Sequence, residues 1–209
     1  MCGVCANGDW LCGQCEHDLV AFGVHCVCCT RKMGRAGLKC GRCLRVPHAL
    51  DEVFVGYHYG FVVRECLLKA KYGRDRGALL VLERLAGRVA QMADLAVEMV
   101  VPMPIAKRRL AVRGFNQSRF LARAVAKVTG AAMVDGVLVK SARVAQSSLH
   151  SDALRFANIR GAFAIRRAVS GHVLLVDDVV TSGATAQEAA RMLKIAGAEK
   201  VSLLAVAGR

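Results

Sequence analysis

Two adjacent carboxylates and a run of small hydroxyl residues follow an apolar segment near the end of the chain. The segment Val173–Val176 leads into Asp177 and Asp178, and a turn follows whose residues are Thr181, Ser182, Gly183, Ala184 and Thr185. Carboxylates can bind sugar hydroxyls or a divalent cation, and the free N–H groups at the start of a helix can bind a phosphate. If the apolar segment is a strand, these groups lie at its carboxyl end, where open α/β sheets bind ligands. The pattern therefore predicts a ribose 5-phosphate site.

Two other interpretations fit parts of this segment. The run Thr185-Ala186-Gln187-Glu188 has the pattern of a capping box, in which Thr185 caps the helix, although capping and phosphate binding can coexist. A strand that ends in two aspartates also occurs in receiver-like domains. That fold needs several further strands and a downstream phospho-acceptor aspartate, and residues 179–209 contain no aspartate. The receiver interpretation is therefore excluded.

A basic loop follows another short apolar run that ends at Pro102 and Pro104. A pyrophosphate needs cations and backbone donors at such a strand end, because its charge has to be neutralised. The candidate pyrophosphate ligands are Arg108, Arg109 and Arg113. A solvated basic loop is the alternative. A second basic cluster, near a loop, consists of Lys69, Lys71 and Arg74. For this cluster, phosphate binding and a solvated surface are equally consistent with the sequence.

Nine of the ten cysteines stand before Leu44, and eight of them form Cys-x-x-Cys pairs. The pairs are Cys2/Cys5, Cys12/Cys15, Cys26/Cys29 and Cys40/Cys43. A single pair could be a redox dithiol, but two pairs together supply a tetrahedral thiolate site for zinc. Four pairs predict two structural zinc ions, with consecutive pairs sharing an ion as the simplest assignment and an interleaved arrangement still open. Cys28 could replace Cys26 as the ligand beside Cys29.

The elements that must position these groups follow from hydrophobic periodicity. Strands are expected at residues 53–59, 96–101, 133–139, 173–176 and 201–207, and helices at residues 61–71, 78–92, 116–129 and 184–196. Strands that alternate with helices predict an α/β fold with a mostly parallel sheet flanked by helices. We expect a Cys-rich module at residues 1–46 and an α/β domain at residues 47–209, whose lead-in is residues 47–93 and whose core is residues 94–209.

Composition narrows the function classes. Lys and Arg number 30 against 16 Asp and Glu, and the formal net charge of +14 attracts phosphate groups of small ligands or of nucleic acids. An uninvolved basic surface is the alternative. The apolar fraction of 55% excludes a disordered chain. No apolar run reaches membrane-spanning length and no secretory signal opens the sequence, so we expect a cytoplasmic protein.

The segment from Asp177 to Thr185 resembles the phosphoribosyl-pyrophosphate (PRPP) signature of type I phosphoribosyltransferases. The resemblance implies that Asp177 and Asp178 contact the ribose 2′- and 3′-hydroxyls, directly or through Mg²⁺-bound water. It also implies that the residues from Thr181 to Thr185 wrap the 5′-phosphate. PRPP and Mg²⁺ are therefore the expected ligands, and the acceptor of the phosphoribosyl group is not identified by any motif.

The order of the motifs along the whole chain resembles the ComF family of competence-associated proteins. That order comprises the cysteine pairs, Val101-Pro102-Met103-Pro104, Arg113-Gly114-Phe115-Asn116-Gln117 and the PRPP segment. The resemblance also implies a flexible loop over the reacting centre between Lys140 and Gly161, with Arg143, Gln146 and Arg155 in it. Val144, Thr30 and the extra Cys28 depart from the family pattern.

ComF membership implies a role in DNA uptake during natural transformation, with single-stranded DNA and the DNA-uptake helicase machinery as expected partners. Two functions then stand side by side. One is a phosphoribosyltransferase that acts on PRPP. The other is a non-catalytic, single-stranded-DNA-binding competence factor whose PRPP site is regulatory or vestigial.

Overall fold

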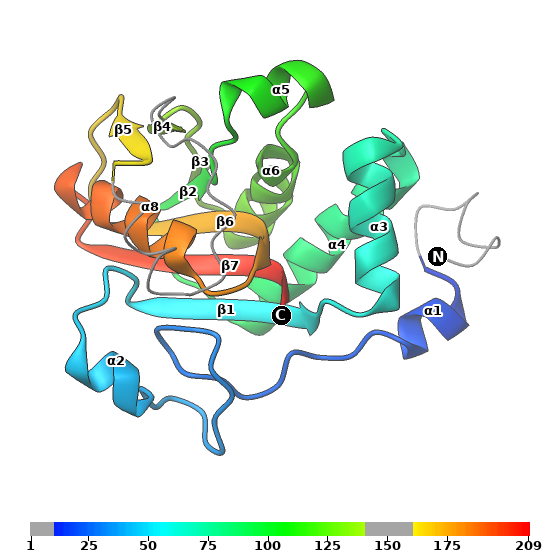
Figure 1. Cartoon of the computed structure of the whole chain (residues 1–209), viewed down its shortest axis with the longest axis horizontal. Helices are drawn as coiled ribbons and strands as arrows, with labels where there is room; N and C mark the ends of the chain where they lie inside the picture. The colour runs from blue at the N-terminus through cyan, green and yellow to red at the C-terminus, as the bar shows by residue number, and fades with distance from the viewer. Residues whose placement is uncertain (1–10, 141–160) are drawn as a thin grey trace.

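A five-stranded parallel sheet forms the centre of the molecule in the computed structural model, which describes residues 11–140 and 161–209 (Figure 1). Its strands, in spatial order, are β1 (Glu52–His58), β7 (Lys200–Gly208), β6 (His172–Val180), β2 (Met99–Pro102) and β3 (Ala132–Met133). Every strand pairing within this sheet is parallel. The mostly parallel sheet expected from the sequence is confirmed.

Helices cover both faces of the sheet (Figure 1). One face carries α3 (Phe61–Tyr72), α4 (Arg76–Met92) and α6 (Gln117–Thr129). The other face carries α8 (Ala184–Ile195) and a two-stranded antiparallel pair, β4 (Leu138–Lys140) with β5 (Phe163–Ile165). A short helix, α5 (Lys107–Arg113), follows β2.

Alternation along the two central strands builds one apolar cluster on each face of the sheet. Leu174 and Leu204 belong to the cluster beneath α4 and α6, whereas their neighbours Leu175 and Leu203 belong to the cluster beneath α8. Successive side chains of a strand point to opposite faces, so an unbroken apolar run serves both clusters. This double burial fixes β6, which carries the two aspartates.

The strand expected at residues 133–139 is wrong as a single element. The chain leaves the large sheet after Met133, and β4 begins only at Leu138 in the antiparallel pair. Gly136 stands between them with a φ of +72°, a left-handed conformation that glycine adopts readily. The turn at Gly136 therefore divides a segment that the sequence pattern predicted to be one continuous strand.

The Cys-rich segment runs along β1, the edge strand of the sheet. Ala21 forms an antiparallel bridge with Tyr57, and His58 N–H donates to the Val20 carbonyl at 2.8 Å. His25 Nε2 lies 2.9 Å from the Val53 carbonyl. These contacts cover backbone groups that an edge strand otherwise exposes. The division into residues 1–46 and 47–209 stays a prediction.

Two one-turn helices mark this segment, α1 (Gly13–His17) and α2 (Gly41–Arg45), and each begins directly after a cysteine. Across residues 11–140 and 161–209, no helix combines the length and apolar character that crossing a membrane requires.

Candidate functional site

A cavity of about 230 Å³ opens where β6, α8 and the segment after β2 meet. The ionisable residues that line it come from the four elements α3, α5, β4 and β6, and they are Lys71, Arg109, Arg113, Lys140, Asp177 and Asp178. Four cations against two carboxylates favour an anionic ligand that carries more negative charge than a single carboxylate. The same cavity is lined by the whole turn from Thr181 to Thr185.

Asp177 and Asp178 lie within β6, three residues and two residues before its end, and not after the strand as the sequence suggested. Asp177 Oδ1 accepts a hydrogen bond from Ser118 Oγ at 3.1 Å and another from the Asp178 N–H at 2.9 Å. Burial raises the pKa of Asp177 to about 7, and the neighbouring Asp178 charge adds to the rise. This carboxyl can therefore change its protonation state near neutral pH.

Asp178 pairs with Lys71 from the last turn of α3, with 2.6 Å between Nζ and Oδ2. Both side chains are largely shielded from solvent, at 21% and 14% exposure. The sequence left Lys71 equally consistent with a solvated cluster, and the structure brings it into the cavity. Lys69 and Arg74 of that cluster do not line it.

The turn that precedes α8 presents backbone N–H groups to the cavity. Gly183 is the N-cap of α8, with a φ of +72°, and as a glycine it has no side chain to cap the helix; the Ala184 N–H donates a long hydrogen bond of 3.5 Å to Ser182 Oγ. The capping-box interpretation is therefore wrong: Thr185 lies inside the first turn, and Glu188 instead bonds Arg191 and the Gly161 N–H. An N-terminus whose N-cap residue has no side chain offers N–H groups and its positive dipole end to an anion.

The basic loop contributes two of its three expected arginines. Arg109 and Arg113 of α5 line the cavity, whereas Arg108, on the same helix, does not. The expected closing-loop residues Arg143, Gln146 and Arg155 lie outside the described residues.

Three further lining residues were not singled out as ligands from the sequence. Lys140, at the end of β4, is half-buried there, and burial lowers its pKa with a further contribution from Arg109. Ser118 and Gln117 belong to the first turn of α6. Ser118 could have been inferred because it directly follows the recognised Asn116-Gln117 pair, whereas Lys140 reaches the cavity only through the turn at Gly136.

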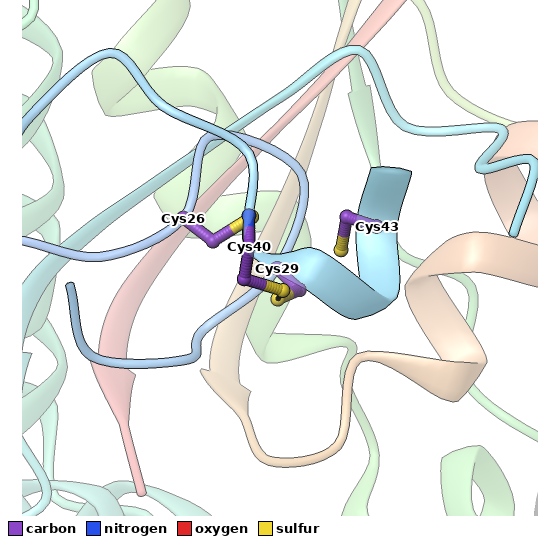
Figure 2. A group of neighbouring side chains, drawn as sticks. All are labelled: Cys26, Cys29, Cys40 and Cys43. Atoms are coloured by element: carbon purple, nitrogen blue, oxygen red, sulfur yellow. Dashed lines mark hydrogen bonds between the residues drawn. The ribbon is translucent and has the colours of Figure 1, made fainter. Parts of the chain in front are cut away.

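A second group of functional side chains lies in the Cys-rich segment, in the four-thiol cluster of Cys26, Cys29, Cys40 and Cys43 (Figure 2). All four sulfurs lie within 4.8 Å of one another, and the Cys40 N–H donates to Cys26 Sγ at 3.2 Å. Four converging thiols, with an N–H group that can stabilise a thiolate, suit a tetrahedral structural zinc site.

The geometry also decides between Cys26 and Cys28. The Cys28 thiol donates to the Asp51 carbonyl at 3.6 Å and is not a member of the four-thiol cluster. Cys26 is therefore the partner of Cys29. The pairing of the third and fourth Cys-x-x-Cys motifs matches the consecutive assignment. For the other ion, Cys12 and Cys15 lie at α1, and Cys2 and Cys5 lie outside the described residues.

The sequences of several named proteins align with nearly the whole chain. DNA utilization protein YhgH of Salmonella typhi is 30% identical, over 97% of this chain and 94% of its own. The chain belongs to the ComF/YhgH family. The YhgH protein of Escherichia coli K12 is 28% identical, and Competence protein F of Haemophilus influenzae is 25% identical over 98% of this chain and 92% of its own.

The family predicted from the order of motifs is thus confirmed for this ComF/YhgH chain. No protein-family model matches it. A solved structure of the allosteric regulatory enzyme of purine biosynthesis overlaps 59% of this ComF/YhgH chain and 25% of its own, with 24% identity and a TM-score of 0.40. So partial an overlap carries no argument about function.

Proposed function

We propose that this ComF/YhgH protein binds PRPP in the 230 Å³ cavity. The observation that carries the proposal is the convergence of three unlike groups on one cavity: a pair of aspartates, four cations and a helix N-terminus whose N-cap is glycine. A ribose with a phosphate at one end and a pyrophosphate at the other needs these three groups together. A ligand with phosphate alone would not need the aspartates.

In the proposed complex the 5′-phosphate occupies the turn from Thr181 to Thr185, and the ribose hydroxyls face Asp177 and Asp178. The pyrophosphate faces Arg109 and Arg113. Carboxylate oxygens are the protein ligands that Mg²⁺ takes, so the aspartate pair also fits the Mg²⁺ that accompanies PRPP and neutralises its charge. Lys71 balances the Asp178 charge until the ligand arrives, since the two are paired at 2.6 Å.

A transfer reaction is the chemical use that we propose for this site. The bond from ribose C1 to the pyrophosphate oxygen breaks, the pyrophosphate keeps the electron pair, and an acceptor nucleophile forms the new bond to C1. Arg109, Arg113 and Lys140 stabilise the negative charge that develops on the leaving pyrophosphate. Release of pyrophosphate that depends on an added acceptor is the measurement that tests catalysis separately from binding.

Calorimetric titration with PRPP and Mg²⁺ tests the binding proposal. We expect saturable binding to the wild-type protein and at least about tenfold weaker binding to the Asp177→Asn, Asp178→Asn double variant, since the hydroxyl-binding carboxylates become neutral. Asp94→Asn is the matched control, because Asp94 is exposed and does not line the cavity. Equal affinities of the wild-type and double-variant proteins, or no binding to a folded wild type, would contradict the proposal.

A role in DNA uptake is the second proposed function, and the names of the relatives and the net charge of +14 favour it. Single-stranded DNA is the proposed ligand, and cations of the surface would contact its phosphates. We expect its affinity to fall steeply as salt rises, because each phosphate contact releases counterions. Fluorescence anisotropy with a labelled oligonucleotide at several salt concentrations measures this slope, and an affinity that does not change with salt would count against it.

A further inference from the structure

The turn that we propose to hold the 5′-phosphate has two sides. One side lines the 230 Å³ cavity. The other side, formed by Val180–Gly183, lines a second cavity of about 360 Å³. The opposite wall of this second cavity belongs to residues 26–43, here called the metal knuckle, and includes Cys29, Thr30 and Cys43. The turn therefore lies against a hollow on its outer side and not against a packed core.

Two hydrogen-bonded tethers cross from the metal knuckle to this turn and to the helix it begins. Thr30 Oγ1 donates to the Thr181 carbonyl at 3.0 Å. Gln187 Nε2, from the first turn of α8, donates to the Cys28 carbonyl at 3.2 Å. Because a cavity separates the two regions, these hydrogen bonds hold the turn in place against the metal knuckle, as apolar packing holds the elements of the sheet in place.

The Gln187 amide is used at both ends. While Nε2 donates to Cys28, Oε1 accepts from the Ala49 N–H at 2.9 Å and from the Leu50 N–H at 3.2 Å. Its own backbone N–H donates to the Gly183 carbonyl at 2.8 Å, which closes the first turn of α8. A side-chain amide can both donate and accept in this way, whereas a carboxylate has no donor and an aliphatic chain has neither.

Both tethers are anchored beside Cys29 of the four-thiol cluster. Cys28 and Thr30 are the two neighbours in sequence of Cys29, whose sulfur lies 3.8 Å from that of Cys40 within the four-thiol cluster. Coordination of Cys29 would fix the backbone on both sides of it, because metal binding in so small a module supplies its folding free energy. Among the described residues, no cysteine lines the 230 Å³ cavity, so any effect of the metal on that cavity has to pass through such contacts.

We infer that Thr30 and Gln187 are positioning residues which couple metal binding in the knuckle to the geometry of the phosphate-binding turn. This inference rests on the proposed PRPP site. Metal loss releases Cys29, the Cys28 carbonyl and the Thr30 hydroxyl move, and the turn loses the support that holds its N–H groups toward the phosphate. The knuckle then controls PRPP affinity without touching PRPP.

PRPP titrations of four proteins test the coupling: the wild type and a Thr30→Val, Gln187→Glu double variant, each with metal and after removal of the metal by a chelator. Both substitutions nearly keep side-chain volume and remove the donors. We expect about tenfold weaker PRPP binding in the metal-loaded double variant, and a similar loss in the metal-free wild type. Metal removal from the double variant should add little, because its tethers are already absent.

Metal content and thermal unfolding of the double variant separate positioning from damage to the fold. We expect the double variant to bind as much metal as the wild type and to have a similar melting temperature. We also expect a Thr30→Ser, Gln187→Glu variant, which keeps the hydroxyl at position 30, to bind PRPP as tightly as the Gln187→Glu single variant. A metal-loaded double variant that binds PRPP as tightly as the wild type overturns the inference. A double variant that loses its metal whenever it loses PRPP affinity also overturns the inference, because damage to the metal site would then explain the weaker binding.

Hydrogen exchange of the peptide that spans residues 178–186 keeps the test independent of PRPP. We expect faster exchange there after metal removal and in the double variant, with exchange in β7 unchanged. If the wild type does not bind PRPP, the proposed function fails while the exchange result still decides the coupling. Unchanged exchange in the turn after metal removal overturns the coupling whatever the affinity for PRPP.

Discussion

The metal knuckle and the strand β6, whose end we propose to bind phosphate, are held in place by different means. The knuckle has a core of four thiols with only a few apolar neighbours, among them Val27 and Met33. The strand β6 lies between two large apolar clusters, and its residues from Val173 to Val176 are fully buried. We expect the first region to depend on metal coordination for its shape, whereas the second depends on burial. Metal removal should therefore disorder the knuckle and loosen the turn joined to it, and a mutation that opens a cavity should weaken the sheet.

Metal removal is the largest expected effect of this difference. We predict that a chelator, or Cys43→Ser, abolishes the ordered fold of residues 26–45, because apparent zinc-binding free energies in such modules are of order 10 kcal/mol. Hydrogen exchange by mass spectrometry should show full exchange in this segment while β7 and residues 172–177 of β6 stay protected. Cys66→Ser is the matched control, since Cys66 is buried in the helical cluster and away from the four thiols. Parallel loss of protection at residues 172–177 would show that the knuckle and the sheet are one cooperative unit.

A cavity in the sheet should give the reverse pattern. We predict that Leu174→Ala lowers the free energy of unfolding of the sheet by about 2–5 kcal/mol, because Leu174 is fully buried beneath α4 and α6. Metal stoichiometry should not change. Denaturant titration followed by circular dichroism measures the first quantity, and elemental analysis measures the second. Val128→Ala, at an exposed position of α6, is the control and should change the free energy by less than about 0.5 kcal/mol.

The same difference explains how much of the fold the sequence predicted. Helix α6 was predicted nearly to the residue because its signals are local: the Asn116 side chain accepts from the Ser118 N–H, and Gly130 ends the helix with a φ of +71°. The strand β6 was predicted too short, because it was assigned from its unbroken apolar run, which stops before Asp177. Backbone pairing with β7 carries the strand on to Val180.

The residues that line the cavity were predicted where they stand close together in the sequence, within one motif. The aspartate pair and the turn stand together in the sequence, and both line the cavity. Lys71 and Lys140 reach it from α3 and β4, through strand order and turn geometry that no local pattern encodes. Arg108 was chosen along with Arg109 because both are basic, yet adjacent residues of a helix point in different directions and only Arg109 lines the cavity.

The smallest effect we predict separates backbone strain from function. Gly37 in the knuckle and Gly183 in the turn have similar φ values, +77° and +72°, and an added Cβ meets no atom closer than 4.0 Å at either position. Gly37→Ala and Gly183→Ala should therefore each cost about 1–2 kcal/mol of local strain. Only Gly183→Ala should weaken PRPP binding in calorimetry, because relaxing that strain turns the first N–H groups of α8 away from the phosphate. An equal loss of PRPP affinity in both variants would mean that strain in the knuckle is transmitted to the turn. Unchanged PRPP affinity in Gly183→Ala would mean that the helix N-terminus does not hold the phosphate.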